Sequence, residues 1–160
     1  MIIRNAVPAD ATAAAKAEMA CFPAAEAASL TAIRDRIAEY PDRFWIMDDN
    51  GKIAAYVNGM TTNEPDLKDE MYENTSLHDK NGQWQMIFSV GTLPEYRGTG
   101  CASKLLQYVI DLSRNEGKKG LVLTCKNQLI DFYSRFGFID EGISDSTHGG
   151  VTWHKMRLTL

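Results

Sequence analysis

A glycine-containing turn between a strand and a helix constrains the fold of this chain more than any other feature. Residues 84–92 include a near-continuously apolar run, which is typical of a central strand covered on both faces. The turn RGTG follows at 97–100, and apolar side chains recur at helical spacing over 102–112. Residues 120–124, GLVLT, are typical of a second buried strand. We therefore expect a parallel β-α-β unit with a right-handed crossover inside a mixed α/β domain.

The remaining sequence alternates between strand and helix signals. The order that we expect is β-α-α-β-β-β-α-β-α-β-β, with Asp49-Asn50-Gly51 as a hairpin turn. Residues 61–83 show no regular pattern, and so long an irregular connection is more often a functional loop than filler. No repeat or linker interrupts the chain, so we expect one domain over residues 1–160. The other strands are expected at 2–4, 44–47, 53–60, 138–143 and 151–158, and the other helices at 8–20, from 24 or 25 to 39, and 129–135.

Composition excludes several classes of protein. No stretch approaches the roughly 18 consecutive apolar residues of a membrane helix, and the N-terminus lacks the pattern of a secretory signal. The three cysteines have no CxxC spacing, which argues against a disulfide framework and a structural zinc site, so no metal is expected. The net charge is −4 and no basic cluster is long, so a nucleic-acid surface is not expected. A reducing cytoplasm is the simplest location.

The turn at 97–100 is suited to holding an anion. The start of a helix presents N–H groups without helical partners and the positive end of the helix dipole. Gly98 and Gly100 allow an anion to approach the backbone, and Arg97 adds a cation whose donors fit phosphate oxygens. A P-loop requires Lys-Ser/Thr after its last glycine, which Cys101-Ala102 does not supply. Ser103 and the late position of the motif fit a dinucleotide fingerprint badly.

Residues 97–102 match the pattern Arg/Gln-x-x-Gly-x-Gly/Ala. The match resembles the coenzyme A pyrophosphate loop of the GNAT N-acetyltransferase superfamily, and DFYSRFGF at 131–138 stands in that family's order and spacing. Cys21-Phe22-Pro23 with Glu26, and Ser76-Leu77-His78, are most similar to the serotonin (arylalkylamine) branch. The resemblance covers nearly the whole chain. It implies the GNAT fold, a mixed central sheet with splayed middle strands flanked by helices.

The resemblance also implies a reaction. An acetyl group would move from acetyl-CoA to the primary amine of a small molecule by direct attack, and Tyr133 would donate a proton to the departing sulfur. A phenol with a pKa of about 10 suits a thiolate of comparable basicity. The residues that the resemblance assigns to coenzyme A are Val90, Gly91, Thr92, Arg97, Gly98, Thr99, Gly100, Cys101, Ala102, Ser103, Phe132 and Tyr133.

The proton acceptor is where the sequence departs from the arylalkylamine enzymes. Those enzymes carry two histidines on the strand before the loop, and the corresponding positions counted back from Arg97 hold Met86 and Phe88. Neither side chain accepts a proton. A water chain, a carboxylate, or His78 from the loop 61–83 remain as alternatives, and an exposed His78 without a chemical role is another.

The acceptor side is less defined, and its candidate residues are Phe22, Pro23, Tyr72, His78 and Phe88. Acidic residues in the loop 61–83 either attract an ammonium group or form a solvated face. Acetylation of a protein or peptide amine, a non-catalytic regulatory module that binds coenzyme A, and a nucleotide-binding structural domain stay open as alternatives. A homodimer also stays open. The acidic residues in question are Glu64, Asp66, Asp69, Glu70 and Glu73.

Overall fold

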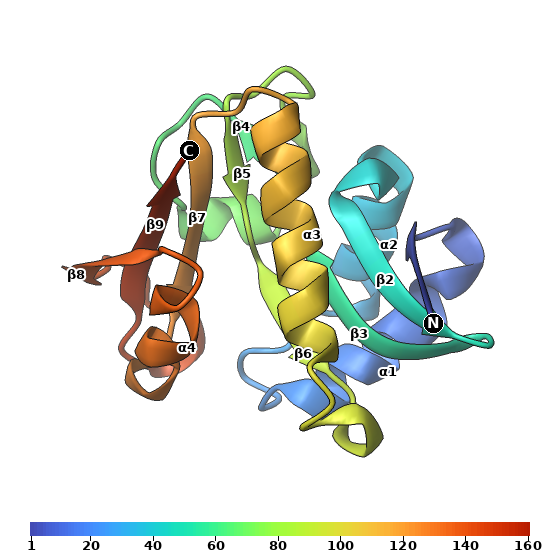
Figure 1. The fold of residues 1–160 in the computed structure, drawn as a ribbon. Coiled ribbons are helices and arrows are strands. Elements are labelled where there is room, and N and C mark those ends of the chain that lie inside the picture. Colours follow the sequence, from blue (N-terminus) through green and yellow to red (C-terminus); the bar gives the residue numbers. More distant parts are fainter. The chain divides into compact units, whose positions relative to one another are not determined.

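The computed structural model describes residues 1–160, and Figure 1 follows the chain from its N-terminus in blue to its C-terminus in red. The residues form two compact units. The first comprises Met1–Gly59 and Ser89–Tyr108, and the second comprises Met60–Phe88 and Val109–Leu160. The mixed α/β class expected from the sequence is confirmed, because both units contain strands and helices. The expectation of a single domain over 1–160 stays a prediction.

The first unit contains an antiparallel sheet with the strand order β1-β2-β3-β6. Its strands are β1 (Ile2–Asn5), β2 (Phe44–Asp49), β3 (Lys52–Asn58) and β6 (Ser89–Thr92). The expected hairpin turn joins β2 to β3. Asn50 and Gly51 have φ values of 49° and 90°, which a two-residue hairpin turn of this kind requires. Strand β6 lies at one edge of this sheet and pairs only with β3 there.

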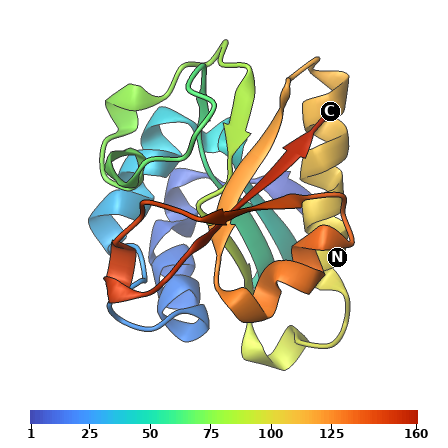
Figure 2. The ribbon, with the colours of Figure 1, turned by 90° about the vertical axis from the view of Figure 1, so that its left-hand side faces the viewer.

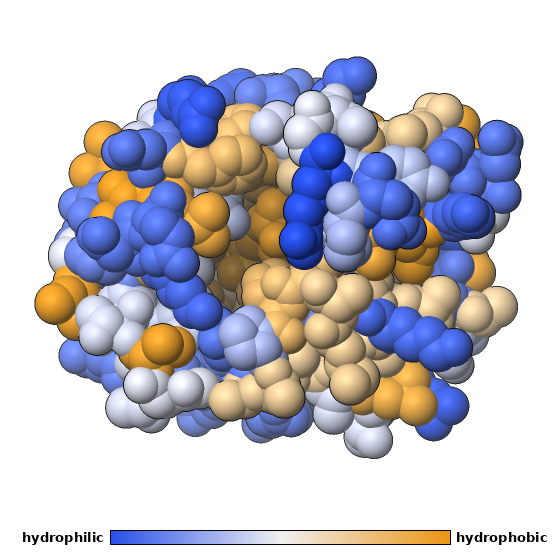
Figure 3. Space-filling model, turned by 90° about the horizontal axis from the view of Figure 1, so that it is seen from below, coloured by the Kyte–Doolittle hydropathy of each residue, from blue (hydrophilic) through white to orange (hydrophobic).

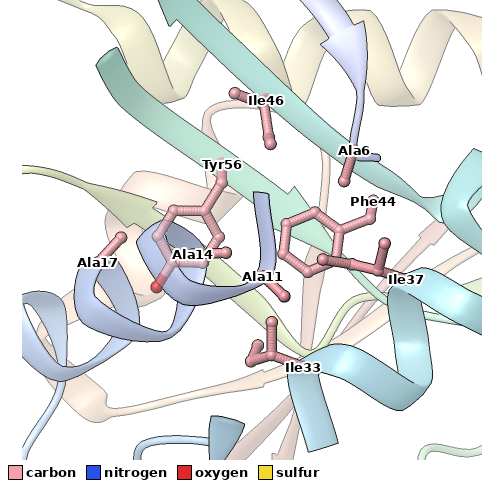
Figure 4. Packing of buried hydrophobic residues seen from close by; sticks show 9 residues of the cluster. All are labelled: Ala6, Ala11, Ala14, Ala17, Ile33, Ile37, Phe44, Ile46 and Tyr56. Carbon is pink, nitrogen blue, oxygen red and sulfur yellow. The ribbon is translucent and has the colours of Figure 1, made fainter. Parts of the chain in front are cut away.

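Two helices, α1 (Ala11–Cys21) and α2 (Leu30–Glu39), complete the core of the first unit. Figure 4 shows small alanine side chains of α1 beside the larger side chains of α2, β2 and β3. The rings of Phe44 and Tyr56 stack at a centroid distance of 6.3 Å within this core. The buried cluster consists of Ala6, Ala11, Ala14, Ala17, Ile33, Ile37, Phe44, Ile46 and Tyr56.

The expected start of the second helix at residue 24 or 25 is wrong, because α2 begins at Leu30. The amide groups of Glu26 and Ala27 both donate to Pro23 O, which closes a turn rather than a helix. Ser29 then caps α2 in an extended conformation, and its side chain accepts a hydrogen bond from Ala32 N at 3.1 Å. A serine at this position is a strong helix start, and it outweighs the helix propensity of the alanines before it.

The second unit contains a sheet with the strand order β4-β5-β7-β9-β8. Strand β5 pairs in parallel with β7, which confirms the parallel pairing expected for the β-α-β unit. Figure 2 shows β9, in red, beside β7, in orange, and the two pair antiparallel. The strands are β4 (Thr61–Thr62), β5 (Trp84–Met86), β7 (Gly120–Cys125), β8 (Ile139–Ile143) and β9 (His154–Thr159).

The single strand expected over 84–92 is wrong. The chain forms β5, which belongs to the second sheet, and then β6, which belongs to the first. Ile87 and Phe88 lie between them, and Ile87 N still donates to Val122 O on β7 at 2.9 Å. The apolar run through Val90 did not reveal this change, because residues in both ladders are buried.

Helix α3 (Cys101–Asn115) follows the glycine turn as expected, and a short helix, α4 (Ile130–Ser134), precedes β8.

No helix combines the length and the apolar character that crossing a membrane requires. Polar and apolar residues are interspersed on the face shown in Figure 3. Residues 63–83 contain two short 3-10 turns, Asp69–Tyr72 and Thr75–Leu77.

Candidate active site

The glycine turn has a backbone that only glycine adopts readily. Gly98 and Gly100 both have a φ of +80°, and apart from each glycine and its two chain neighbours no residue comes within 4 Å of the position that a Cβ would take. The amide of Lys104 donates to Gly100 O at 3.0 Å and makes the first hydrogen bond of α3. The amides of Cys101, Ala102 and Ser103 therefore precede the helical ladder, as the first N–H groups of any helix do. These groups form a place where an anion can be bound.

Tyr96 anchors this turn through two groups, its backbone carbonyl oxygen and its phenol. Its carbonyl oxygen accepts hydrogen bonds from the amide and the hydroxyl of Thr99. Its phenol donates to Asp49 Oδ2 at 2.7 Å, next to the β2–β3 hairpin turn. This carboxylate raises the pKa of Tyr96 to about 12, and partial burial adds to the effect. Neither Tyr96 nor Asp49 is predicted from the sequence to contribute to the site.

Arg97 is exposed, and its Nε donates to Thr92 O at 3.3 Å. The thiol of Cys21 donates to the same oxygen, also at 3.3 Å. Burial raises the pKa of the Cys21 thiol, and the nearby Arg97 guanidinium opposes the rise. A guanidinium has five N–H donors in a planar fork, so Arg97 has donors suited to phosphate oxygens.

Strand β6 turns polar backbone groups away from its own sheet. Leu93 N donates to Ala54 O at 3.0 Å, and Gly91 is the residue opposite Tyr56. Because the bonds of an antiparallel ladder alternate, the N–H and C=O groups of Val90 and the N–H of Thr92 point away from β3. This is the geometry that an extended ligand needs in order to add to a strand edge.

A buried polar cluster packs against β6, and the sequence analysis missed it. Glu18 of α1 is 2% exposed, and its carboxylate accepts hydrogen bonds from Tyr56 Oη at 2.6 Å and from Ala28 N at 2.8 Å. Ser89 Oγ, on β6, lies 3.4 Å from Glu18 Oε2. The signal was present in the sequence: Glu18 follows Ala14 by four residues and so lies on the buried face of α1.

Tyr133 of α4 is buried in the second unit. Its ring contacts Phe132 and Phe138 edge-to-face, at centroid distances of 5.0 and 5.9 Å. Burial raises the pKa of its phenol above the usual value, and the neighbouring Cys125 thiol raises it further. A phenol of this kind stays protonated near neutral pH and acts as a donor.

Two of the expected acceptor-side residues lie together in the second unit. The ring of Tyr72 contacts that of Phe88 at 4.9 Å, and its hydroxyl lies 3.3 Å from Thr124 Oγ1. Two further members of this aromatic group, His148 and Trp153, are not predicted from the sequence. His148 stacks on Tyr72 at 5.1 Å with an interplanar angle of 9°, and Trp153 Nε1 donates to the His148 carbonyl oxygen at 2.7 Å.

The side chain of His78 is bound to the backbone of Thr61 in the second unit. Its Nδ1 accepts a hydrogen bond from Thr61 N at 3.1 Å, so that nitrogen is already engaged. Met86 is fully buried. Of the acceptor-side residues expected in the first unit, Phe22 is half-buried against the core cluster and Pro23 is exposed.

The acidic residues of the loop have basic or polar partners elsewhere in the second unit. Asp66 forms salt bridges with Lys155 at 2.9 Å and Arg157 at 2.7 Å, and Lys155 contributes most to lowering its pKa. Asp69 accepts hydrogen bonds from Ser146 Oγ at 2.5 Å and from Thr147 N at 3.0 Å. Asp66 therefore holds the loop to β9, and Asp69 holds it to the connection between β8 and β9. Both are poor candidates for attracting an ammonium group.

The comparisons with known proteins agree with the fold. The acetyltransferase (GNAT) family model matches residues 12–138. Serotonin N-acetyltransferase of Mesocricetus auratus is 26% identical over 113 residues, which are 70% of this chain and 53% of that protein, so the match spans about half of the relative's length.

Two solved structures are similar over nearly the whole chain. The GphF GNAT-like decarboxylase in complex with isobutyryl-CoA has a TM-score of 0.86 at 19% identity, covering 99% of each chain. The loading GNATL domain of CurA from Lyngbya majuscula has a TM-score of 0.85 at 15% identity, covering 99% of this chain and 96% of that one. These likenesses confirm the fold that the glycine turn and the strand order suggest. With a family model matched over most of its length, the chain belongs to the acetyltransferase (GNAT) family.

Proposed function

We propose that this chain is an N-acetyltransferase that moves an acetyl group from acetyl-CoA to the primary amine of a small molecule. The observation that carries the proposal is the glycine turn. Gly98 and Gly100 hold positive φ values with no neighbour at their Cβ positions, directly before the first turn of a long helix. Such amides, with Arg97 beside them, suit a pyrophosphate.

The backbone of β6 supports the binding of an extended arm. The outward N–H and C=O groups of Val90 and the N–H of Thr92 would pair with the amides of pantetheine, as an added strand does. The proposed coenzyme site is completed by Gly91, Phe132 and the residues of the turn from Thr99 to Ser103. Bound in this way, the thioester becomes an acyl donor that an amine can attack directly.

Tyr133 is the proposed general acid. The departing sulfur takes up a proton as the bond between carbon and sulfur breaks, and the phenol supplies it. Burial raises the pKa of Tyr133, so the phenol keeps its proton until the thiolate develops.

The acceptor proposed first is an arylalkylamine. The likeness to serotonin N-acetyltransferase supports this class, as does the aromatic group of Tyr72, Phe88, His148 and Trp153. Aromatic side chains of this kind bind the apolar part of such an amine well. Peptide amines are the alternative within the same chemistry.

The test is a thiol-release assay with acetyl-CoA and a panel of arylalkylamines, polyamines, amino acids and short peptides. We expect amine-dependent release of free thiol, fastest with an arylalkylamine. Isobutyryl-CoA is included as a second donor, because the similar decarboxylase carries that compound. Binding of acetyl-CoA without release by any amine would contradict the proposal and favour a regulatory module.

Tyr133→Phe tests the general acid. We expect the turnover number to fall about 100-fold while the KM for acetyl-CoA changes little, because only the proton is lost. Tyr108→Phe is the matched control, since this tyrosine is exposed on α3. Unchanged turnover of Tyr133→Phe at all pH values would refute the assignment.

A further inference from the structure

Glu18 is a buried carboxylate that the proposed reaction does not yet use. It is 2% exposed, and the partners of its oxygens are the phenol of Tyr56, the amide of Ala28 and the hydroxyl of Ser89. Burying a carboxylate is costly unless donors compensate for the lost water. A glutamine or a leucine would fill this helix position at lower cost, so the charge itself needs an explanation.

The groups around Glu18 are a phenol, a thiol and, farther out, a cation. Tyr56 of β3 has its pKa raised by burial first and by the negative charge of Glu18 second. Cys21, on the same helix, has a thiol whose pKa is raised by burial. Arg97 lies beside Cys21 and is a permanent cation. Glu18 therefore places a carboxylate, a group whose oxygens can accept a proton, beside β6.

Ser89 connects Glu18 to the strand on which the acyl donor is proposed to lie, and this step rests on the proposed function. Strand β6 runs from Ser89 to Thr92 and continues towards the glycine turn. A donor with its pyrophosphate at residues 98–103 and its arm along β6 therefore has its acyl end towards Ser89. The hydroxyl of Ser89 is then the side-chain group of β6 nearest to the attacking nitrogen.

We propose that Glu18 receives the proton of the attacking amine, with Ser89 as the relay. Ser89 Oγ takes a proton from the amine nitrogen while its own hydroxyl proton passes to Glu18 Oε2. The amine starts as an ammonium, so the lone pair freed on nitrogen forms the bond to the acyl carbon, and the bond to sulfur breaks. The sulfur takes its proton from Tyr133, and the acylated nitrogen loses its second proton to water. The Tyr133 phenolate then takes a proton from water and Glu18 releases its proton to water, which restores both residues.

The distance between Ser89 and Glu18 is compatible with this role. At 3.4 Å it is longer than a strong hydrogen bond between oxygens. Such contacts are often long without substrate and shorten when it binds. The other two donors, at 2.6 and 2.8 Å, keep the carboxylate in place while the contact with Ser89 adjusts.

Glu18→Gln is the main test, because glutamine keeps the shape and removes the basic oxygen. With the best amine from the thiol-release screen, we expect kcat/KM for the amine to fall about 100-fold, with the KM for acetyl-CoA unchanged. The dependence of the loss on the basicity of the acceptor distinguishes a missing proton acceptor from a structural defect. A weakly basic acceptor, such as an alkoxyamine analogue, is already neutral and should lose much less activity than the parent amine. Glu39→Gln, an exposed change on α2, is the control and should behave as wild type.

Equal loss with both acceptors would overturn the proposal, since a purely structural defect does not depend on the basicity of the amine. Unchanged activity of Glu18→Gln would overturn it too. If the glutamine variant does not fold, as judged by its thermal unfolding, Ser89→Ala replaces it. That variant keeps the Tyr56 and Ala28 contacts and should show the same dependence on the acceptor. If the wild-type protein releases no thiol with any amine, the proposed function fails instead.

Discussion

The lack of a side chain at Gly91 on β6 allows the ring of Tyr56 to pack directly against that strand. A Cβ at Gly91 would lie 2.5 Å from a ring carbon of Tyr56, a distance that no folded structure tolerates without movement. Tyr56 is itself fixed by its hydrogen bond to Glu18. The absence of a side chain at residue 91 thus determines where the phenol and the carboxylate lie.

Gly91→Ala is therefore expected to lower the free energy of unfolding by about 1–3 kcal/mol, the usual cost of overpacking a core. The urea midpoint of purified protein measures this change. In a Tyr56→Ala background the ring is absent, so the same glycine change should cost much less. Equal costs in the two backgrounds would show that the ring is not the cause.

The contact between Tyr96 and Asp49 is expected to preorganise the glycine turn. Tyr96→Phe and Asp49→Ala should each raise the KM for acetyl-CoA about fivefold with little change in kcat, as the loss of one hydrogen bond does. The double variant should be no worse than either single one, because both remove the same bond. Tyr108→Phe again serves as the control. Additive effects would argue against a shared contact.

Residue-level prediction from the sequence was uneven for a physical reason. The glycines at 98 and 100 were identifiable because few side chains tolerate a φ of +80°. Glu18 and Ser89 were not, since they are adjacent only through tertiary contacts between α1 and β6. No local pattern in the sequence reports such a contact.

At the level of elements, ion pairs and caps determine where the strands and helices begin. Arg4 of β1 forms a bidentate contact with Asp10, at 2.7 and 2.9 Å, and also bonds Asp48 of β2 at 2.8 Å. Val7 N donates to Asp10 at 2.7 Å. One carboxylate thus joins β1 to the turn that leads into α1.

Asp10→Asn should lower the free energy of unfolding at pH 7 by up to about 1 kcal/mol. Arg4 is the main cause of the lowered pKa of Asp10. A carboxyl whose pKa is lower in the folded state contributes stability above its unfolded pKa, about 3.9. That contribution is lost as the pH falls through the folded value. The difference between wild type and variant should therefore shrink below about pH 4, as urea titrations would show. A difference independent of pH would contradict this.

Elements with strong local signals were predictable. The hairpin at Asn50-Gly51, helix α3 and strand β7 were identified because turn residues, helical spacing and a short apolar run each specify local geometry. The change of sheet between Met86 and Ser89 was not, because pairing partners distant in sequence decide it. The late start of α2 depended on Ser29, a cap that follows a run of residues equally suited to a helix.

For the whole molecule, the proposed donor should stabilise the folded state. A ligand that binds only the folded protein adds about 2.7 kcal/mol at 100 times its Kd. We expect acetyl-CoA to raise the unfolding midpoint, and Arg97→Ala to require a much higher concentration for the same rise. Arg114→Ala, which removes an exposed arginine paired with Asp111, is the control. Stabilisation by nucleotides but not by acetyl-CoA would contradict the proposed donor.

The tight approach of Tyr56 to Gly91 also has a consequence for how relatives of this chain can diverge. A side chain at residue 91 is compatible only with a smaller residue at 56, because one backbone position and one ring compete for the same space. The two positions should accordingly change as a pair among descendants. A lineage that acquires a bulkier residue 91 while retaining an aromatic residue 56 should be rare.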